Sequence, residues 1–336
     1  MTSKVNGCAV GGGRLARAVV ALSLAVLAAC GGGSQVERFV PARMIALGDE
    51  NNLIEADGSK YTVNALTTAT PAAPDCTVNL LWIQIVAGQY GLRFPRCLSG
   101  AASTSSGIYA SNLAKVSDLP AQIAAAGPLG ATDLVSVFVG ANDIFDLYAG
   151  CNGCDVTALL ARAGAAGTAL AAQLAAITKQ GAKVVFLTIP ELGSTPYARD
   201  QEALHPGAAA LLTNLTVAFN TKLRTGVSNQ NSPSFIDGHQ GVQVLADDLF
   251  RPIVAAGSTT TGYLNVVDGI CNKLLAATVL QCNTNTLLLG DGTTTPVLTA
   301  GGTPGNYLWA DDKHLSPGGH STLGSTAAAR VNANPL

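Results

Sequence analysis

The chain has 336 residues, a formal net charge of −2 and a charged fraction of 12%. A near-neutral chain without a basic stripe is not expected to bind nucleic acid. The length beyond the N-terminal leader is enough for one large domain or two small ones.

The N-terminus has the pattern of an export signal. Lys4, Arg14 and Arg17 provide positive charge, and residues 18–29 form a short apolar segment that ends in small residues. This segment is too short to span a bilayer, which takes roughly 20 apolar residues. An ordinary secretory signal followed by an incidental Cys30 is one interpretation of the pattern.

Residues 27–30 (LAAC) also resemble the lipobox of bacterial lipoproteins, in which the cysteine becomes the lipid-carrying N-terminus. The resemblance implies a signal peptide over residues 1–29, a lipid anchor and flexible tether over residues 30–40, and one domain over residues 41–336. The lipidated residue would be Cys30. Because Gly31 and not an aspartate follows it, we expect a protein anchored at the bacterial cell envelope, in the outer membrane.

Three short apolar runs predict buried strands, at residues 43–47, 133–140 and 182–189. None of them alternates between polar and apolar residues, as expected for parallel strands that are covered on both faces. A further short strand is expected at residues 235–236. The strands therefore predict a mainly parallel sheet.

Helical segments lie between and after these strands, and the chain closes with another. We expect helices at residues 79–91, 156–179, 206–224 and 318–332. Gly181 is a plausible C-cap, and Pro206 suits a first helical turn. Strands and helices that alternate in this way predict an α/β fold. Within the Thr/Gly-rich segment 278–305, residues 287–295 (LLLGDGTTT) predict a hairpin or an insertion.

Eight cysteines are present, and six of them lie beyond Cys30. An even number in an exported chain predicts disulfides, for which six cysteines allow fifteen pairings in principle. The sequence-local pairs are Cys76–Cys97, Cys151–Cys154 and Cys271–Cys282. The CNGC stretch also fits a redox motif or half of a zinc site. It lies in a loop and lacks a second pair of metal ligands, so we expect a disulfide that closes the loop and no metal ion.

Polar blocks follow two of the predicted strands, and a third polar block lies near the C-terminus. Gly48-Asp49-Glu50 follows the first strand, GAND (residues 140–143) follows the second, and DDKH (residues 311–314) lies near the C-terminus. Open α/β sheets bind ligands beyond the carboxyl ends of their strands. We therefore expect these blocks to converge.

In this order, the blocks resemble those of the SGNH (GDSL) hydrolase family, over roughly residues 40–330. Its blocks are Gly-Asp-Ser, a glycine in a later loop, Gly-x-Asn-Asp and Asp-x-x-His. The resemblance implies a three-layer α/β/α sandwich with a flavodoxin-like, mainly parallel sheet. It also implies a monomer that hydrolyses a small-molecule or lipid ester and uses no cofactor.

The resemblance assigns a role to each matching position. His314 would be the general base, and Asp311 would orient its imidazole. The oxyanion hole would consist of the Asn142 side chain and the backbone N–H groups of Gly100 and residue 50. Two departures lie nearby: Leu315 replaces the usual proline, and the asparagine–aromatic lead-in to the Gly100 block is missing.

The main departure is Glu50, which stands where the family has its nucleophilic serine. Glutamate is a weak nucleophile, and its charge opposes the negative charge of an acyl-transfer transition state. If Glu50 meets His314, a carboxylate–imidazolium pair is expected, which removes the base.

Three interpretations of the site therefore remain. In the first, the protein is an ester hydrolase in which Glu50 is the nucleophile or positions water, or in which Ser99 or Ser103 substitutes as nucleophile. In the second, it is a non-catalytic protein that binds a lipid, acyl or glycan ligand. In the third, four side chains hold a metal ion; these are Asp49, Glu50, Asp311 and His314.

Overall fold

The computed structural model describes residues 39–97, 105–151, 153–236, 238, 240–258, 261–288 and 294–333. The predicted lipidation site, Cys30, and the predicted oxyanion-hole residue Gly100 both lie outside the described residues, as do Ser99 and Ser103. The chain from Phe39 onward forms one structural unit.

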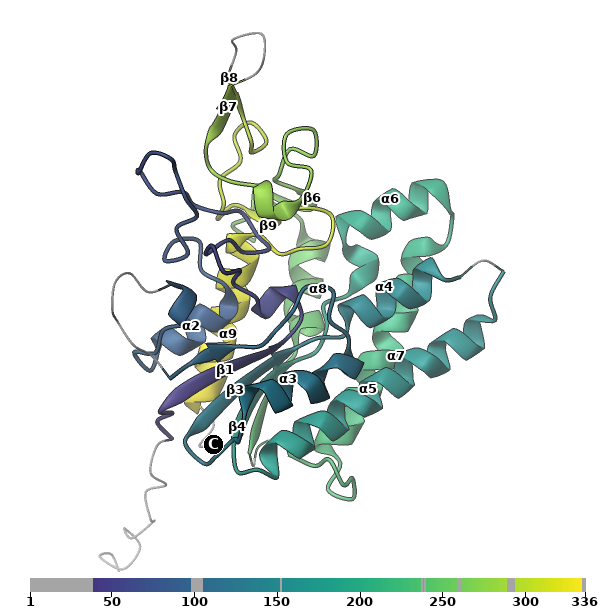
Figure 1. Cartoon of the computed structure of the whole chain (residues 1–336). Coiled ribbons are helices and arrows are strands. Elements are labelled where there is room, and N and C mark those ends of the chain that lie inside the picture. The colour runs from purple at the N-terminus through teal and green to yellow at the C-terminus, as the bar shows by residue number, and fades with distance from the viewer. Residues whose placement is uncertain are drawn as a thin grey trace, which may run out of the picture. The chain divides into compact units, whose positions relative to one another are not determined.

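Five parallel strands form the central sheet, in the order β2-β1-β3-β4-β5 (Figure 1). They are β1 (Arg43–Gly48), β2 (Gly107–Ile108), β3 (Asp133–Phe138), β4 (Lys183–Leu187) and β5 (Gly241–Val244). The three apolar runs thus form strands as predicted. Their residues are almost completely buried, as a parallel sheet covered on both faces requires.

The short strand predicted at residues 235–236 is wrong. Ile236 lies in the turn after α7 (Ala208–Ser228), where its N–H donates to the carbonyl of Val227 at 3.0 Å. The strand comes a few residues later, as β5, whose sequence GVQV is short and contains a buried glutamine. These residues form a strand because they pair with β4, and not because they form an apolar run.

Helices cover both faces of the sheet (Figure 1). One layer contains α3 (Leu119–Ala126), α5 (Val156–Thr178) and α7, and the opposite layer contains α2 (Trp82–Gly88) and α9 (Pro317–Ala333). The remaining helices are α4 (Ala141–Ala149), α6 (Pro196–Leu204) and α8 (Ala246–Ala256). The three-layer α/β/α prediction is confirmed. Although α5 is long and apolar enough to cross a membrane, here it packs against α7 and β4.

Two helices are shorter at their N-termini than predicted. Before α2, Asn79 adopts a left-handed conformation (φ 52°) and Leu81 an extended one, so the helix begins only at Trp82. Before α7, Gly207 is left-handed with φ 95°, so Pro206 lies outside the helix. In both cases a residue with positive φ ends the preceding turn and sets the new chain direction.

Three smaller features complete the fold. Strands β7 (Thr286–Leu288) and β8 (Thr294–Pro296) form the predicted hairpin, and β6 (Asn265–Gly269) pairs in parallel with β9 (Tyr307–Trp309). The three predicted disulfides are also confirmed; they are Cys76–Cys97, Cys151–Cys154 and Cys271–Cys282.

The sheet order places its switch point between β1 and β3, because the chain goes from β1 to one side and later returns to the other. Gly48 ends β1 with φ 119°, and a Cβ there would overlap the carbonyl of Phe138 at the end of β3. Gly140 has φ 125°, and a Cβ there would overlap the ring of Phe219. Gly48 thus lets the ends of β1 and β3 approach closely, and Gly140 lets the start of α4 approach α7.

Candidate active site

Glu50 begins a short 3-10 helix, η1 (Glu50–Asn52), directly beyond β1. Asp49 caps this helix, since its carboxylate accepts a hydrogen bond from the Asn51 N–H at 3.0 Å. The two adjacent carboxylates therefore point to different partners. Glu50 is only 6% exposed, so its carboxylate must find hydrogen-bond donors inside the protein.

Two donors hold the Glu50 carboxylate. The Leu113 N–H donates to Oε2 at 3.0 Å, and the Asn142 side-chain amide donates to Oε2 at 3.0 Å and to Oε1 at 3.3 Å. Leu113 lies in the loop after β2, and Asn142 lies in the first turn of α4, after β3. A backbone N–H and an asparagine amide aimed at one point are the groups that form an oxyanion hole.

The predicted acid–base pair lies on the turn between β9 and α9, which we call the histidine turn (residues 310–316). The His314 Nδ1 lies 2.8 Å from Asp311 Oδ2, and the His314 backbone N–H donates to Asp311 Oδ1 at 2.7 Å. The other ring nitrogen, Nε2, lies 3.6 Å from Glu50 Oε1. The structure thus brings together Glu50, Asn142, Asp311 and His314, as the sequence predicted.

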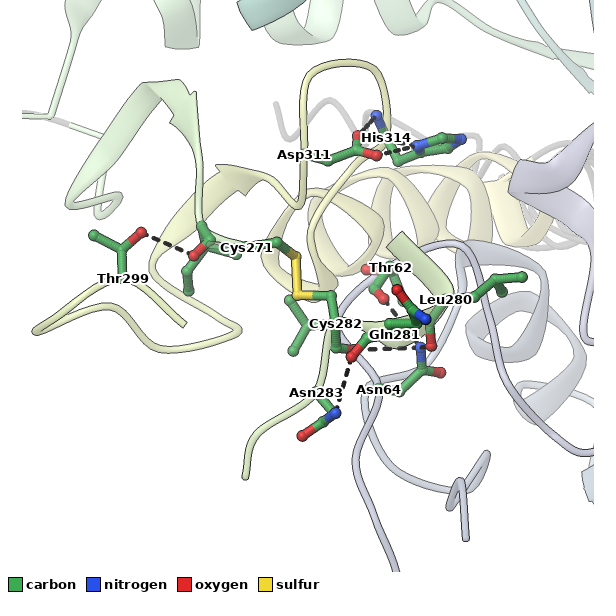
Figure 2. The surroundings of a disulfide bond; sticks show 12 residues. Thr62, Asn64, Cys271, Leu280, Gln281, Cys282, Asn283, Thr299, Asp311 and His314 are labelled. Atoms are coloured by element: carbon green, nitrogen blue, oxygen red, sulfur yellow. Dashed lines mark hydrogen bonds and ion pairs between the residues drawn. A yellow bond between two sulfur atoms is a disulfide. The ribbon is translucent and has the colours of Figure 1, made fainter. Parts of the chain in front are cut away.

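Figure 2 shows what supports the histidine turn: Asp311 and His314 lie close to the Cys271–Cys282 disulfide and to the segment around Thr62 and Asn64. The Cys271 N–H donates to the carbonyl of Ala310 at 2.8 Å, and the Asn64 N–H donates to that of Cys282 at 2.8 Å. The Thr62 hydroxyl donates to the carbonyl of Leu315, also in the histidine turn, at 2.9 Å. The chain that follows Glu50 therefore helps to position His314.

Charge in the site favours a protonated histidine. Burial by itself lowers the pKa of His314, but the Asp311 and Glu50 carboxylates outweigh burial and raise that pKa to about 10. Burial likewise opposes ionisation of Glu50 and Asp311, yet their contacts with His314 hold both carboxyl pKa values below the usual range. At neutral pH, His314 is an imidazolium between two carboxylates.

The protonation state of Asp49 differs from that of Glu50. Complete burial, followed by the nearby charge of Glu50, raises the pKa of Asp49 well above its usual value. Its Oδ2 has no hydrogen-bond partner among the described residues, which favours the protonated acid. Within that part of the chain, no group of three His, Cys, Asp or Glu side chains is arranged to hold a metal ion. The metal interpretation therefore gains no support from the geometry.

No residue pattern pointed to Leu113, whose N–H has the donor role that the family resemblance implies for Gly100. The rule that functional residues follow parallel strands points to this loop, because it follows β2. However, β2 is only two residues long, and no apolar run marks it. A leucine also gives no hint of an N–H donor, since any residue except proline carries one.

An aromatic pair beside the histidine turn was also missed. The Lys313 ammonium lies 4.4 Å from the ring centre of Tyr197 and 4.7 Å from that of Phe145. The Tyr197 N–H donates to the carbonyl of Asp312 at 2.9 Å. These contacts join the histidine turn to α4 and α6 and are another means of holding His314.

Comparison with known proteins agrees with this geometry. The family model described as GDSL-like Lipase/Acylhydrolase matches residues 74–326, which is most of the chain. The chain belongs to this family. The match to this acyl ester hydrolase family includes Asn142, Asp311 and His314 but begins after Glu50, so it carries no information on the substituted position. A search among curated proteins found no significant match.

Proposed function

We propose that this member of the GDSL-like lipase/acylhydrolase family binds an acyl or ester ligand without rapid hydrolysis. One observation carries the proposal: the Glu50 carboxylate accepts the hydrogen bonds of Leu113 and Asn142 that an ester oxyanion needs. A negative charge already in the hole opposes the second one that acyl transfer would develop there.

The state of His314 supports the same conclusion. A serine-type mechanism needs a neutral imidazole that accepts the proton of the nucleophile. With its pKa raised to about 10 by Asp311 and Glu50 against the effect of burial, His314 holds a proton at neutral pH. It then acts as a fixed positive charge and not as a base.

Glu50 is also badly placed to be the nucleophile itself. Its two carboxylate oxygens accept the hydrogen bonds of the hole, so an ester carbonyl cannot lie in the hole while Glu50 attacks it. When the Glu50 side chain moves out, two N–H donors and the His314 ring remain, and an anion bound there keeps that ring protonated. Such a set binds an anion, and the carboxylate of a fatty acid or another acyl product fits that chemistry.

A second candidate is slow ester hydrolysis with Glu50 turned out of the hole, where it acts as a base for water or as a nucleophile. The observation in its favour is that the other parts of the site are in place: the Asp311–His314 pair at 2.8 Å and the N–H donors of Leu113 and Asn142. The two candidates share one fold and one site, and they differ in turnover.

The test compares the hydrolysis of short-chain p-nitrophenyl esters by wild type, Glu50→Ser, His314→Ala and the double variant. We expect no wild-type turnover above that of His314→Ala. Glu50→Ser should be at least about a hundredfold faster than wild type, since an alcohol nucleophile and an empty oxyanion hole are both restored. The gain should disappear in the double variant.

Two results would contradict the proposal. Wild-type turnover that is lost in His314→Ala would favour the slow hydrolase. A Glu50→Ser variant that is folded and inert would mean that the rest of the site is not a working hydrolase site. Urea unfolding of each variant distinguishes this second result from simple loss of the fold.

We further propose that the protein is exported, lipid-modified at Cys30 and held at the cell envelope, in the outer membrane, as a monomer that takes a small-molecule or lipid ester. The support is the leader sequence with its LAAC motif. Incorporation of radiolabelled palmitate should occur in the full chain and be lost in Cys30→Ser. Incorporation that survives this substitution would exclude the anchor.

A further inference from the structure

The loop that carries the Leu113 N–H, residues 113–116, has an unfavourable conformation at its first residue. Leu113 adopts the left-handed region, with φ 57°, which a side chain with a Cβ disfavours. Its side chain is 65% exposed, so burial of that side chain cannot hold the backbone in place. Other contacts must fix the direction of this N–H.

The first turn of α4 supplies these contacts. The Asp143 carboxylate accepts a hydrogen bond from the Val116 N–H at 3.0 Å, and the Asn142 amide donates to the carbonyl of Ala114 at 3.2 Å. Asp143 therefore accepts a hydrogen bond from the loop backbone, and Asn142 donates one to it. Asn142 also donates to Glu50, whereas Asp143 accepts from the loop backbone.

The side chains of Ala114 and Val116 are buried and also anchor the loop, whereas its other polar contacts are local or lie at the surface. The Lys115 N–H donates to Asp118 Oδ2 at 2.8 Å, within the start of the next short helix, η3 (Val116–Asp118). The Lys115 ammonium pairs with the exposed Asp146 carboxylate. The first bond is local and cannot fix the loop relative to the hole, and the second acts through a long, exposed side chain.

We propose that Asp143 is the positioning residue of the oxyanion hole: by binding the Val116 N–H, it fixes residues 113–116 so that the Leu113 N–H points into the hole. Asp143 itself does not touch the occupant of the hole. The role is the same whether that occupant is the Glu50 carboxylate or the oxygen of a ligand. The inference therefore goes beyond the proposed function and does not depend on turnover.

The Leu113 amide can be observed directly by NMR in the full chain. Labelling with ¹³C-carbonyl asparagine and ¹⁵N leucine selects Asn-Leu pairs, of which the sequence has those ending in Leu53, Leu80, Leu113 and Leu215. An Asn112→Ser variant identifies the Leu113 signal by its loss. Leu215, in α7, reports on the fold away from the hole.

The test measures amide hydrogen exchange at Leu113 in wild type, Asp143→Ala and Asp143→Asn. Loss of this partly buried hydrogen bond in Asp143→Ala should speed Leu113 exchange about tenfold or more and shift its signal, while Leu215 stays unchanged. Asparagine keeps an oxygen that can accept from Val116, so Asp143→Asn should retain most of the protection. Asp146→Ala, which removes a carboxylate from the same helix, should leave Leu113 unchanged.

Val116→Pro provides an independent variant that leaves Asp143 in place. It removes the N–H donor at the first position of η3, where proline is tolerated, and the preceding Lys115 is already extended. Its effect on Leu113 should match that of Asp143→Ala. The proposal would be overturned if Leu113 exchange were unchanged in either folded variant. It would also be overturned if Asp143→Ala and Asp146→Ala had equal effects. The ester assay does not enter this test, so its outcome and that of the proposed function are separate.

Discussion

Replacement of Glu50 by glutamine tests the charge balance of the site with almost no change in shape. The His314 Nε2 and Glu50 Oε1 atoms lie 3.6 Å apart. At an effective dielectric constant of about 20, two unit charges at this distance attract by about 4–5 kcal/mol. That energy corresponds to roughly three pKa units. Since glutamine can still accept from Leu113 and Asn142, the main change is the loss of charge.

The pKa of His314 is about 10 in wild type, so we expect it to fall to about 7 in Glu50→Gln, with Asp311 as the remaining carboxylate partner. Ring signals of the four histidines can be followed by NMR between pH 5 and 11 (an approximate range that brackets both values). His314→Ala assigns the signal. Glu55→Gln is the matched control, because Glu55 bonds the hydroxyl of Tyr61 and not the histidine.

A fall of less than about one unit in Glu50→Gln would refute the reasoning, because an ion pair at this distance cannot then hold His314 protonated. An equal fall in Glu55→Gln would refute it as well, since the effect would be general and not specific to the pair. A His314 that already titrates near its usual pKa in wild type would restore a base to the site and favour slow hydrolysis.

Three further expectations concern stability. The pKa of His314 is raised from 6.5 to about 10, so the stability that its ion pairs provide is full below pH 6.5 and is lost as the pH rises through about 10. The melting temperature of wild type should therefore fall more between these pH values than the melting temperature of Glu50→Gln. The buried Lys60 ammonium donates to the carbonyls of residues 76, 78 and 79. Lys60→Met should therefore lower the free energy of unfolding, measured in urea, by about 2–4 kcal/mol. A decrease below about 1 kcal/mol would mean that water replaces the ammonium. The Cys271–Cys282 disulfide has a sequence separation of 11, so its replacement by two serines should lower the unfolding free energy by about 3 kcal/mol and speed amide exchange in the histidine turn. Unchanged exchange in the turn would show that the contacts of Thr62, Lys313 and Tyr197 hold it without the disulfide.

The layered fold could be predicted because its strongest signals are local. Runs such as residues 133–138 are short, mostly apolar and without alternation, which is the pattern of a strand that is covered on both faces. The disulfides are of the same kind, because cysteines close in sequence meet without a long loop closure. Strands β2 and β5 carry no such signal, since they are short and are defined by their neighbours in the sheet.

The amino-acid sequence by itself indicated which residues meet: the blocks with Glu50 and Asn142 follow parallel strands and so lie at one edge of the sheet, and the family resemblance added His314 to them. Only the tertiary structure decided what they do there. The direction of the Glu50 carboxylate, the use of Leu113 as a donor and the protonation of His314 each depend on groups from strands and loops far apart in the chain. Hydrogen bonds and Coulomb energies depend on distance and orientation, and a local pattern of residues contains neither.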